Sequence, residues 1–212
     1  MFNINKFIEI NKYIKKEGKK TKIIAISKNH EFERVDSAMK SGVKIFGENR
    51  VQEANLKFSE IKKKDTSIEL HLTGPLQTNK VKLALDLFDI FHTLDREKLV
   101  KELSKYPDKI KNKFFFIQVN TGKELTKSGI YPEDVENFLD ICHNNKLKNI
   151  LGLMCIPPIN DDPNKHFQLL KTLSDNLGLD GLSIGMSSDY MTALNFNPLY
   201  IRLGTTLFGK RK

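Results

Sequence analysis

Short apolar runs alternate with longer amphipathic stretches along the whole chain. Eight runs predict strands: Lys22–Ser27, Ile45–Gly47, Glu69–Thr73, Ile90–Thr93, Lys113–Asn120, Ile150–Ile156, Gly181–Ile184 and Tyr200–Leu203. The stretches between them have the apolar spacing of helices: Glu33–Ser41, Val51–Lys63, Thr78–Phe88, Arg96–Tyr106, Pro132–His143, Asn164–Gly178 and Asp189–Asn195. The segment before the first run has the same spacing, without an apolar core or a cleavage site. It predicts a first helix, not a signal peptide.

Several predicted strands are apolar on both faces, for example "KIIAIS", "FFFIQV" and "LGLMCI". Such strands are typical of parallel sheets that are covered on both sides. Strand–helix alternation repeated eight times predicts an α/β fold, a single-domain (β/α)8 barrel over residues 1–212. An open doubly wound sheet is the alternative. The sequence has no linker-like segment and no break in composition, which favours one domain.

The segments that follow the predicted strands differ from those that precede them. The following segments include Lys28, "GEN", "TGPLQTNK", "NTGKELTKSG", "IPP", "GMSSD" and "GTTLFG". They are rich in Gly, Ser, Thr, Asn and Lys, whereas the preceding segments resemble ordinary charged turns. In a barrel of this class the chemistry lies at the carboxyl ends of the strands. The asymmetry therefore indicates one functional face.

The last two of these segments have the composition of an anion site. "GMSSD" and "GTTLFG" each combine glycine with hydroxyl residues at the start of a helical stretch, where backbone N–H groups are free to meet an anion. Phosphate sites in barrels often form from the loops after the seventh and eighth strands. An N-cap serine and a turn glycine explain either segment alone, but the pair in this order favours phosphate.

Lys28 stands where the first apolar run ends. In a barrel mouth its amine would be partly desolvated, which favours the neutral, nucleophilic form. A lysine that reaches solvent is the alternative. Opposite a phosphate site, a lysine that forms a Schiff base with a phosphorylated aldehyde is the better interpretation. Pyridoxal phosphate and a sugar-phosphate aldolase substrate both fit.

Arg202 helps to choose between these two. It precedes Gly204 by two positions on the last predicted strand, so both should face the same side. A guanidinium is always charged, and beside a pyridine nitrogen it disfavours protonation of that nitrogen. An ion pair at the barrel rim is the alternative role for Arg202.

Composition adds limits. The net charge is +9, but the lysines are scattered over helix ends and turns without aromatic residues between them, so we expect a solvated surface and no nucleic-acid partner. No apolar stretch reaches the ~20 residues that cross a bilayer. We expect no membrane association and a cytoplasmic location. Cys142 and Cys155 have no metal-binding spacing and are expected to be free thiols.

Seven motifs together carry a family resemblance: "IAISKNH", "IFGENRVQEA", "HLTGPLQTNK", "TKSG", "GLMCIPP", "LSIGMSSDYMTAL" and "IRLGTTLFG". The sequence resembles the pyridoxal phosphate homeostasis protein family, short relatives of the alanine racemase N-terminal barrel. The motifs extend from about Ile23 to Gly209. The resemblance implies a (β/α)8 barrel that binds pyridoxal 5'-phosphate covalently.

The resemblance also implies roles for individual residues. The Schiff-base lysine corresponds to Lys28, and Asn49 lies beside the cofactor. Ser187, Gly204 and Thr205 would hold the phosphate, Arg202 would face the pyridine nitrogen, and His71 and Met186 would line the pocket. Relatives often have tyrosine after "GEN", where this chain has Arg50, so a role for that tyrosine hydroxyl does not carry over.

Alanine racemases carry a second, β-rich domain that supplies a catalytic group across a dimer interface. We expect no such domain here, because the chain ends three residues after the last motif glycine. Racemisation needs acid–base groups on both faces of the ring, and the sequence offers Lys28 for one face only. The resemblance therefore implies a carrier or regulator of pyridoxal phosphate, not an enzyme, that influences amino-acid and keto-acid metabolism. The expected partners are the cofactor and apo-enzymes that use it, and the expected state is a monomer. A racemase of narrow specificity is the alternative.

Overall fold

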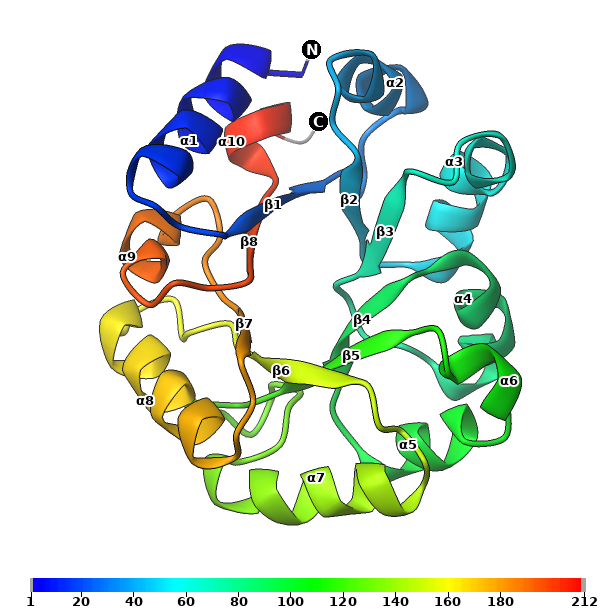
Figure 1. Ribbon diagram of the computed structural model, residues 1–212, viewed down its shortest axis with the longest axis vertical. Coiled ribbons are helices and arrows are strands. Elements are labelled where there is room, and N and C mark those ends of the chain that lie inside the picture. Colours follow the sequence, from blue (N-terminus) through cyan, green and yellow to red (C-terminus); the bar gives the residue numbers. More distant parts are fainter. Residues whose placement is uncertain (1, 211–212) are drawn as a thin grey trace.

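The predicted strands pair side by side into a closed parallel barrel in chain order, β1 to β8 (Figure 1). The structure, a computed structural model, describes residues 2–210. The strands are β1 Lys22–Ile26, β2 Ile45–Glu48, β3 Glu69–Leu72, β4 Ile90–Leu94, β5 Phe114–Gln118, β6 Ile150–Met154, β7 Gly181–Ser183 and β8 Tyr200–Leu203. The predicted (β/α)8 fold is confirmed, and the open-sheet alternative is wrong because β8 pairs with β1.

Helices surround the barrel on the outside (Figure 1). They are α1 Ile4–Lys16, α2 Phe32–Lys40, α3 Val51–Lys64, α4 Val81–Leu87, α5 Glu97–Leu103, α6 Pro107–Ile110, α7 Val135–Asn144, α8 Pro163–Asn176, α9 Tyr190–Leu194 and α10 Thr205–Phe208, with 3-10 turns at Thr78–Lys80 and Pro132–Asp134. The N-terminal helix α1 precedes the barrel and packs beside α10, where the Asn3 N–H donates to the Leu207 carbonyl at 2.8 Å.

Side chains alternate between the interior of the barrel and the helix layer. Ile24, Ile26 and Phe116 belong to a cluster of buried side chains inside the barrel, whereas Ile23 and Ala25 belong to the larger core beneath the helices. This two-residue period explains the apolar runs, because both faces of each strand are covered. The same period continues beyond β1 and turns Lys28 towards the interior face.

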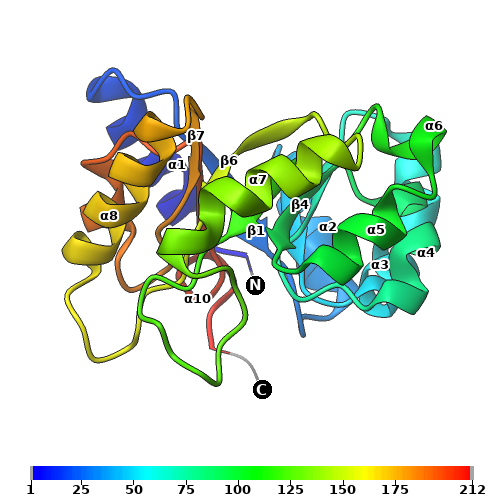
Figure 2. The ribbon, with the colours of Figure 1, turned by 90° about the horizontal axis from the view of Figure 1, so that it is seen from below.

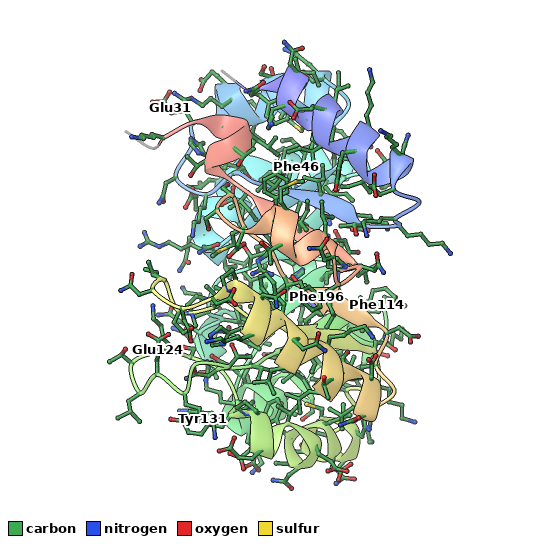
Figure 3. All side chains as sticks on the ribbon, turned by 90° about the vertical axis from the view of Figure 1, so that its left-hand side faces the viewer. Glu31, Phe46, Phe114, Glu124, Tyr131 and Phe196 are labelled. Atoms are coloured by element: carbon green, nitrogen blue, oxygen red, sulfur yellow. The ribbon has the colours of Figure 1, made fainter. Side chains whose placement is uncertain are left out.

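One end of the barrel carries the long segments that follow the strands. In Figure 2 the loops after β5 (green) and after β6 (yellow) extend beyond the barrel at the same end as α10 (red). Figure 3 shows the same polarity: Glu31 and Glu124 lie at one end and Phe114, the first residue of β5, lies at the other. The expected functional face is therefore built from the longest loops.

Candidate functional site

The carboxyl ends of the strands enclose a pocket of about 330 Å³. We call it the barrel-mouth pocket. It is lined by Ile26, Lys28, Asn49, Thr73, Ile156, Met186, Ser187, Ser188, Arg202, Gly204 and Thr205. Seven of the eight residues predicted as site residues are among them, and His71 is the exception. Residues far apart in the sequence thus meet in one cavity, with Lys28 from the β1 end and Arg202 on β8.

Four lining residues were missed by sequence reasoning: Ile26, Thr73, Ile156 and Ser188. Thr73 contacts the amide of Asn49, because its hydroxyl donates to Asn49 Oδ1 at 3.0 Å and lies 3.3 Å from the Glu48 carbonyl. Its position directly after β3 was the available signal. Arg50, in contrast, is exposed and is not a lining residue of this pocket.

Hydroxyl groups and a glycine gather at one part of the pocket. Ser187 accepts a hydrogen bond from the Thr206 N–H at 3.2 Å, which joins the loop after β7 to the start of α10. Gly185 has a φ of 87°, a conformation that favours glycine. A Cβ at Gly204 would lie 3.6 Å from Ile26 Cβ, an ordinary contact, so packing alone does not require glycine there. Close approach of a ligand would require it.

Arg202 is 5% exposed and is held by oxygen atoms of Ser183 on β7 and of Cys155, the residue after β6. Its Nη1 donates to the Ser183 carbonyl at 2.6 Å and to Ser183 Oγ at 2.7 Å, and its Nη2 donates to the Cys155 carbonyl at 2.9 Å. Burial lowers the pKa of Arg202 from its ordinary value, yet a guanidinium stays protonated. Among the ion pairs of residues 2–210 none involves Arg202, so the rim ion pair is not found.

His71 lies apart from the other predicted site residues. It is fully buried inside the barrel, where its Nδ1 lies 2.8 Å from His92 Nε2 and its Nε2 lies 2.8 Å from Glu69 Oε1. Alternation along β3 turns both His71 and Thr73 inward, but only Thr73 is far enough along the strand direction to reach the pocket. The sequence pattern predicts the face of the strand on which a side chain lies, but not how deep in the barrel it lies.

Side chains of α3 hold the turn that carries Lys28. Lys57 Nζ donates to the Ser27 carbonyl at 2.8 Å, to Glu48 Oε1 at 3.0 Å and to Glu53 Oε1 at 2.7 Å. Glu53 also accepts the Asn29 N–H at 2.5 Å, and Asn29 has a φ of 58°. Both backbone neighbours of Lys28 are therefore bound to side chains of one helix.

Glu48 is a buried carboxylate at the centre of this cluster. Its Oε1 accepts the Ser27 hydroxyl at 2.6 Å, whereas its Oε2 has no hydrogen-bond partner within the described part of the chain. Burial raises the pKa of Glu48, and the charge of Lys57 opposes that shift. Sequence reasoning missed this cluster. The spacing of four residues between Glu53 and Lys57 was its signal.

Replacing Lys57 with methionine should destabilise the protein by about 3–5 kcal/mol, because it leaves Glu48 buried without its cation. The loss should shrink as the pH falls, since a protonated Glu48 needs no cation. Denaturant unfolding at pH 7 and pH 5 measures both effects. Lys63→Met is the matched control, because Lys63 forms an exposed pair with Glu60, and we expect a change within about 0.5 kcal/mol. Equal losses for the two variants would contradict the proposed importance of the cluster.

Comparison with known proteins agrees with this geometry. The family model described as "Alanine racemase, N-terminal domain" matches residues 8–212. The pyridoxal phosphate homeostasis protein of Aquifex aeolicus is 36% identical, over 90% of this chain and 87% of that protein. The protein of the same name from Buchnera aphidicola is 35% identical, over 98% of both chains.

Among solved structures, PipY of Synechococcus elongatus without PLP superposes with a TM-score of 0.86 at 30% identity, over 97% of this chain and 99% of that one. A second structure of PipY, described as having PLP bound, gives a TM-score of 0.76 at 32% identity, over 90% and 93% of the two chains. This chain belongs to the alanine racemase N-terminal domain family and, within it, to the pyridoxal phosphate homeostasis proteins.

The remaining sequence expectations concern thiols and membranes. Cys142 and Cys155 are free, as predicted; both are also buried, and burial raises the pKa of each thiol to about 12. Neither is suited to act as a nucleophile near neutral pH. Within residues 2–210, every helix is too short or too polar to cross a bilayer.

Proposed function

We propose that the barrel-mouth pocket binds pyridoxal 5'-phosphate, held as a Schiff base on Lys28, and that the protein serves intracellular homeostasis of this cofactor by buffering or delivering it. The observation that carries the proposal is the meeting of Lys28, Arg202 and the hydroxyl groups near Gly204 in one pocket. The names of the relatives and the PLP-bound PipY structure support it.

The residues present fit this cofactor group by group. Lys28 supplies the amine for the aldehyde, and Ser187, Gly204 and Thr205 supply a polar cradle for the phosphate. Arg202 supplies a cation for the ring nitrogen without a carboxylate beside it. The cavity of about 330 Å³ lies within the ~300–1,000 Å³ of small-molecule sites. When bound, pyridoxal phosphate supplies an aldehyde that captures amines reversibly.

The proposal includes a carrier role without catalytic turnover. Apo-enzymes that depend on pyridoxal phosphate are the proposed recipients, with consequences for amino-acid and keto-acid metabolism. A single barrel domain over residues 1–212, a monomeric state and a cytoplasmic location complete the proposal. The names of the relatives, which describe homeostasis and not a reaction, support the carrier role.

Affinity measurements with Ser187→Ala and Thr205→Ala test whether the phosphate is held as proposed. Each change should weaken the binding of pyridoxal phosphate by about 1–3 kcal/mol, the range for hydrogen bonds to a charged group. Pyridoxal, which lacks the phosphate, should bind far more weakly and should respond little to either change. Equilibrium titration followed by visible absorption gives the dissociation constants.

Thr206→Ala is the matched control for this test. Thr206 follows Thr205 in α10 and is not a lining residue of the pocket. Losing its hydroxyl should therefore leave the affinities for pyridoxal phosphate and for pyridoxal unchanged. Equal losses for pyridoxal and pyridoxal phosphate would show that Ser187 and Thr205 act through folding. Failure of the unaltered protein to bind pyridoxal phosphate would reject the proposed function.

A further inference from the structure

A continuous chain of side-chain hydrogen bonds crosses the interior of the barrel below the pocket. Arg202 Nη1 lies 2.7 Å from Ser183 Oγ, and Ser183 Oγ lies 2.8 Å from His92 Nδ1. His92 Nε2 lies 2.8 Å from His71 Nδ1, and His71 Nε2 lies 2.8 Å from Glu69 Oε1. Four strands contribute: β8, β7, β4 and β3. One end reaches the pocket, and the other ends at the first residue of β3.

The two ends fix the direction of every hydrogen bond between them. Arg202 only donates, and an ionised Glu69 only accepts. The hydrogen bond from His71 lowers the pKa of Glu69, which keeps this carboxylate charged. His71 therefore donates through Nε2–H, so its Nδ1 must accept from His92.

The same reasoning completes the rest of the chain. His92 donates through Nε2–H, so its Nδ1 must accept the hydroxyl proton of Ser183, and Ser183 Oγ accepts from Arg202. Burial lowers the pKa of His71 and lowers that of His92 well below its ordinary value, in agreement with two neutral rings. Both histidines carry their proton on Nε2 in this arrangement.

Aromatic side chains surround the two imidazoles. Phe116 stacks on His92 with the ring centroids 4.8 Å apart, and Tyr200 meets His71 edge-on at 4.8 Å and His92 at 5.8 Å. The Tyr200 hydroxyl also donates to Glu69 Oε1 at 3.3 Å, and Lys22 Nζ lies 5.9 Å from the centroid of the Tyr200 ring. The two imidazoles are therefore enclosed by aromatic side chains inside the barrel.

The hydrogen bonds of Arg202 determine which of its N–H groups are left for a ligand. Both protons of Nη1 are directed at Ser183, and one proton of Nη2 is directed at the Cys155 carbonyl. The Nε–H and the second Nη2–H are not used in the hydrogen bonds of residues 2–210. Since Arg202 lines the pocket, these are the groups that can meet a ring nitrogen there.

We propose that Ser183 and His92 are positioning residues that hold the guanidinium of Arg202 towards the cofactor ring, within a chain of hydrogen bonds that ends at Glu69. The inference rests on the proposed function, since the ring nitrogen belongs to pyridoxal phosphate. A carboxylate in direct contact with Arg202 would compete for the N–H groups that the ligand needs. Ser183 and the Cys155 carbonyl hold the guanidinium and leave those groups available.

The direction of the chain can be tested on the protein without cofactor. Long-range ¹H–¹⁵N NMR correlations distinguish the tautomers of neutral histidine. We expect neutral Nε2–H rings for both His71 and His92 from pH 6 to pH 8. The His92→Asn variant assigns the signals. An Nδ1–H tautomer on either ring, or a charged His92 at pH 7, would overturn the proposed direction.

The link to the cofactor is tested with His92→Asn and His92→Leu, which have nearly the same shape. Asparagine retains an acceptor near the position of Nδ1, and leucine has none. With pyridoxal phosphate carrying ¹⁵N at the ring nitrogen, we expect His92→Asn to retain the chemical shift of the unaltered protein. We expect His92→Leu to move that shift and to bind about tenfold more weakly. Ser183→Ala, a smaller change, should resemble His92→Leu and serves if the leucine variant does not fold.

The possible outcomes separate this inference from the proposed function. Equal ring-nitrogen shifts and affinities in all three variants would show that the chain is structural only and would overturn the positioning role. If the unaltered protein does not bind pyridoxal phosphate, the proposed function and the positioning role are both rejected. The tautomers of the ligand-free protein decide the direction of the chain in either case.

Discussion

Replacing Lys28 with alanine is expected to abolish covalent trapping of pyridoxal phosphate while the protein remains folded. Among the residues that line the barrel-mouth pocket, Lys28 is the only one with a primary amine. Its side chain is half-buried at the rim of the interior and contributes little apolar packing. The phosphate cradle and Arg202 are untouched, so non-covalent binding should persist at reduced affinity. Borohydride reduction followed by peptide mass mapping measures the trapped fraction, and a melting curve measures the fold.

Lys127→Ala is the informative control. Lys127 lines a neighbouring cavity of about 490 Å³ that shares Ile156, Met186 and Ser188 with the barrel-mouth pocket. If Lys28 is the nucleophile, the Lys127 variant should trap cofactor as the unaltered protein does. Undiminished trapping in Lys28→Ala, with the modified peptide mapping to Lys127 or another lysine, would reject the assignment.

The position of Lys28 at the barrel mouth could be predicted because it depends only on the local sequence pattern. The apolar run ends at Ser27, and alternation within β1 then turns Lys28 to the same face as Ile24 and Ile26. The "GEN" segment at the end of β2 shows the same alternation of side chains between the two faces of a strand. Asn49 turns into the pocket, whereas Glu48 turns outward to Lys57 on α3.

Residues whose role depends on distant partners could not be predicted in this way. Ser183 and His92 are 91 residues apart in the sequence, and their hydrogen bond exists only because the barrel closes. His71 was assigned to the pocket because its motif was recognised, but its depth within the barrel depends on the stagger between strands. Helices α6 and α10 have four residues each, which is too short for an apolar period to be seen.

The structure defines the elements that form the site more completely than it defines the chemistry of the site. Fold, pocket and donor groups are compatible with a carrier and with an enzyme, since related barrels serve unrelated functions. The distinction depends on which acid–base groups reach the two faces of the ring. In the barrel-mouth pocket, the described lining residues that carry an ionisable side chain are Lys28 and Arg202. Arg202 stays protonated and is bound to Ser183 and Cys155, so it is not available as a base.

We therefore expect amino acids added to the cofactor-loaded protein to exchange their α-hydrogen only at the background rate. Lys28 can serve one face of the ring, and stereorandom exchange needs a second base on the opposite face. Lys127, Asp161 and Asp189 are ionisable groups that line the neighbouring cavity. Incubation with each common amino acid in heavy water, followed by NMR over hours, measures the exchange directly.

The same preparation should transfer its cofactor to an added apo-enzyme, and recovery of that enzyme's activity reports the transfer. Free pyridoxal phosphate at the same concentration is the control, because a carrier should alter the rate of recovery. Stereorandom exchange of any amino acid at a turnover near the ~10 s⁻¹ typical of enzymes would replace the carrier interpretation with a racemase. In that event Asp189→Asn and Lys127→Met would identify the second base, since loss of exchange in one of them would place the missing group in the neighbouring cavity. Background exchange together with altered transfer would leave the carrier role as the interpretation that both measurements support.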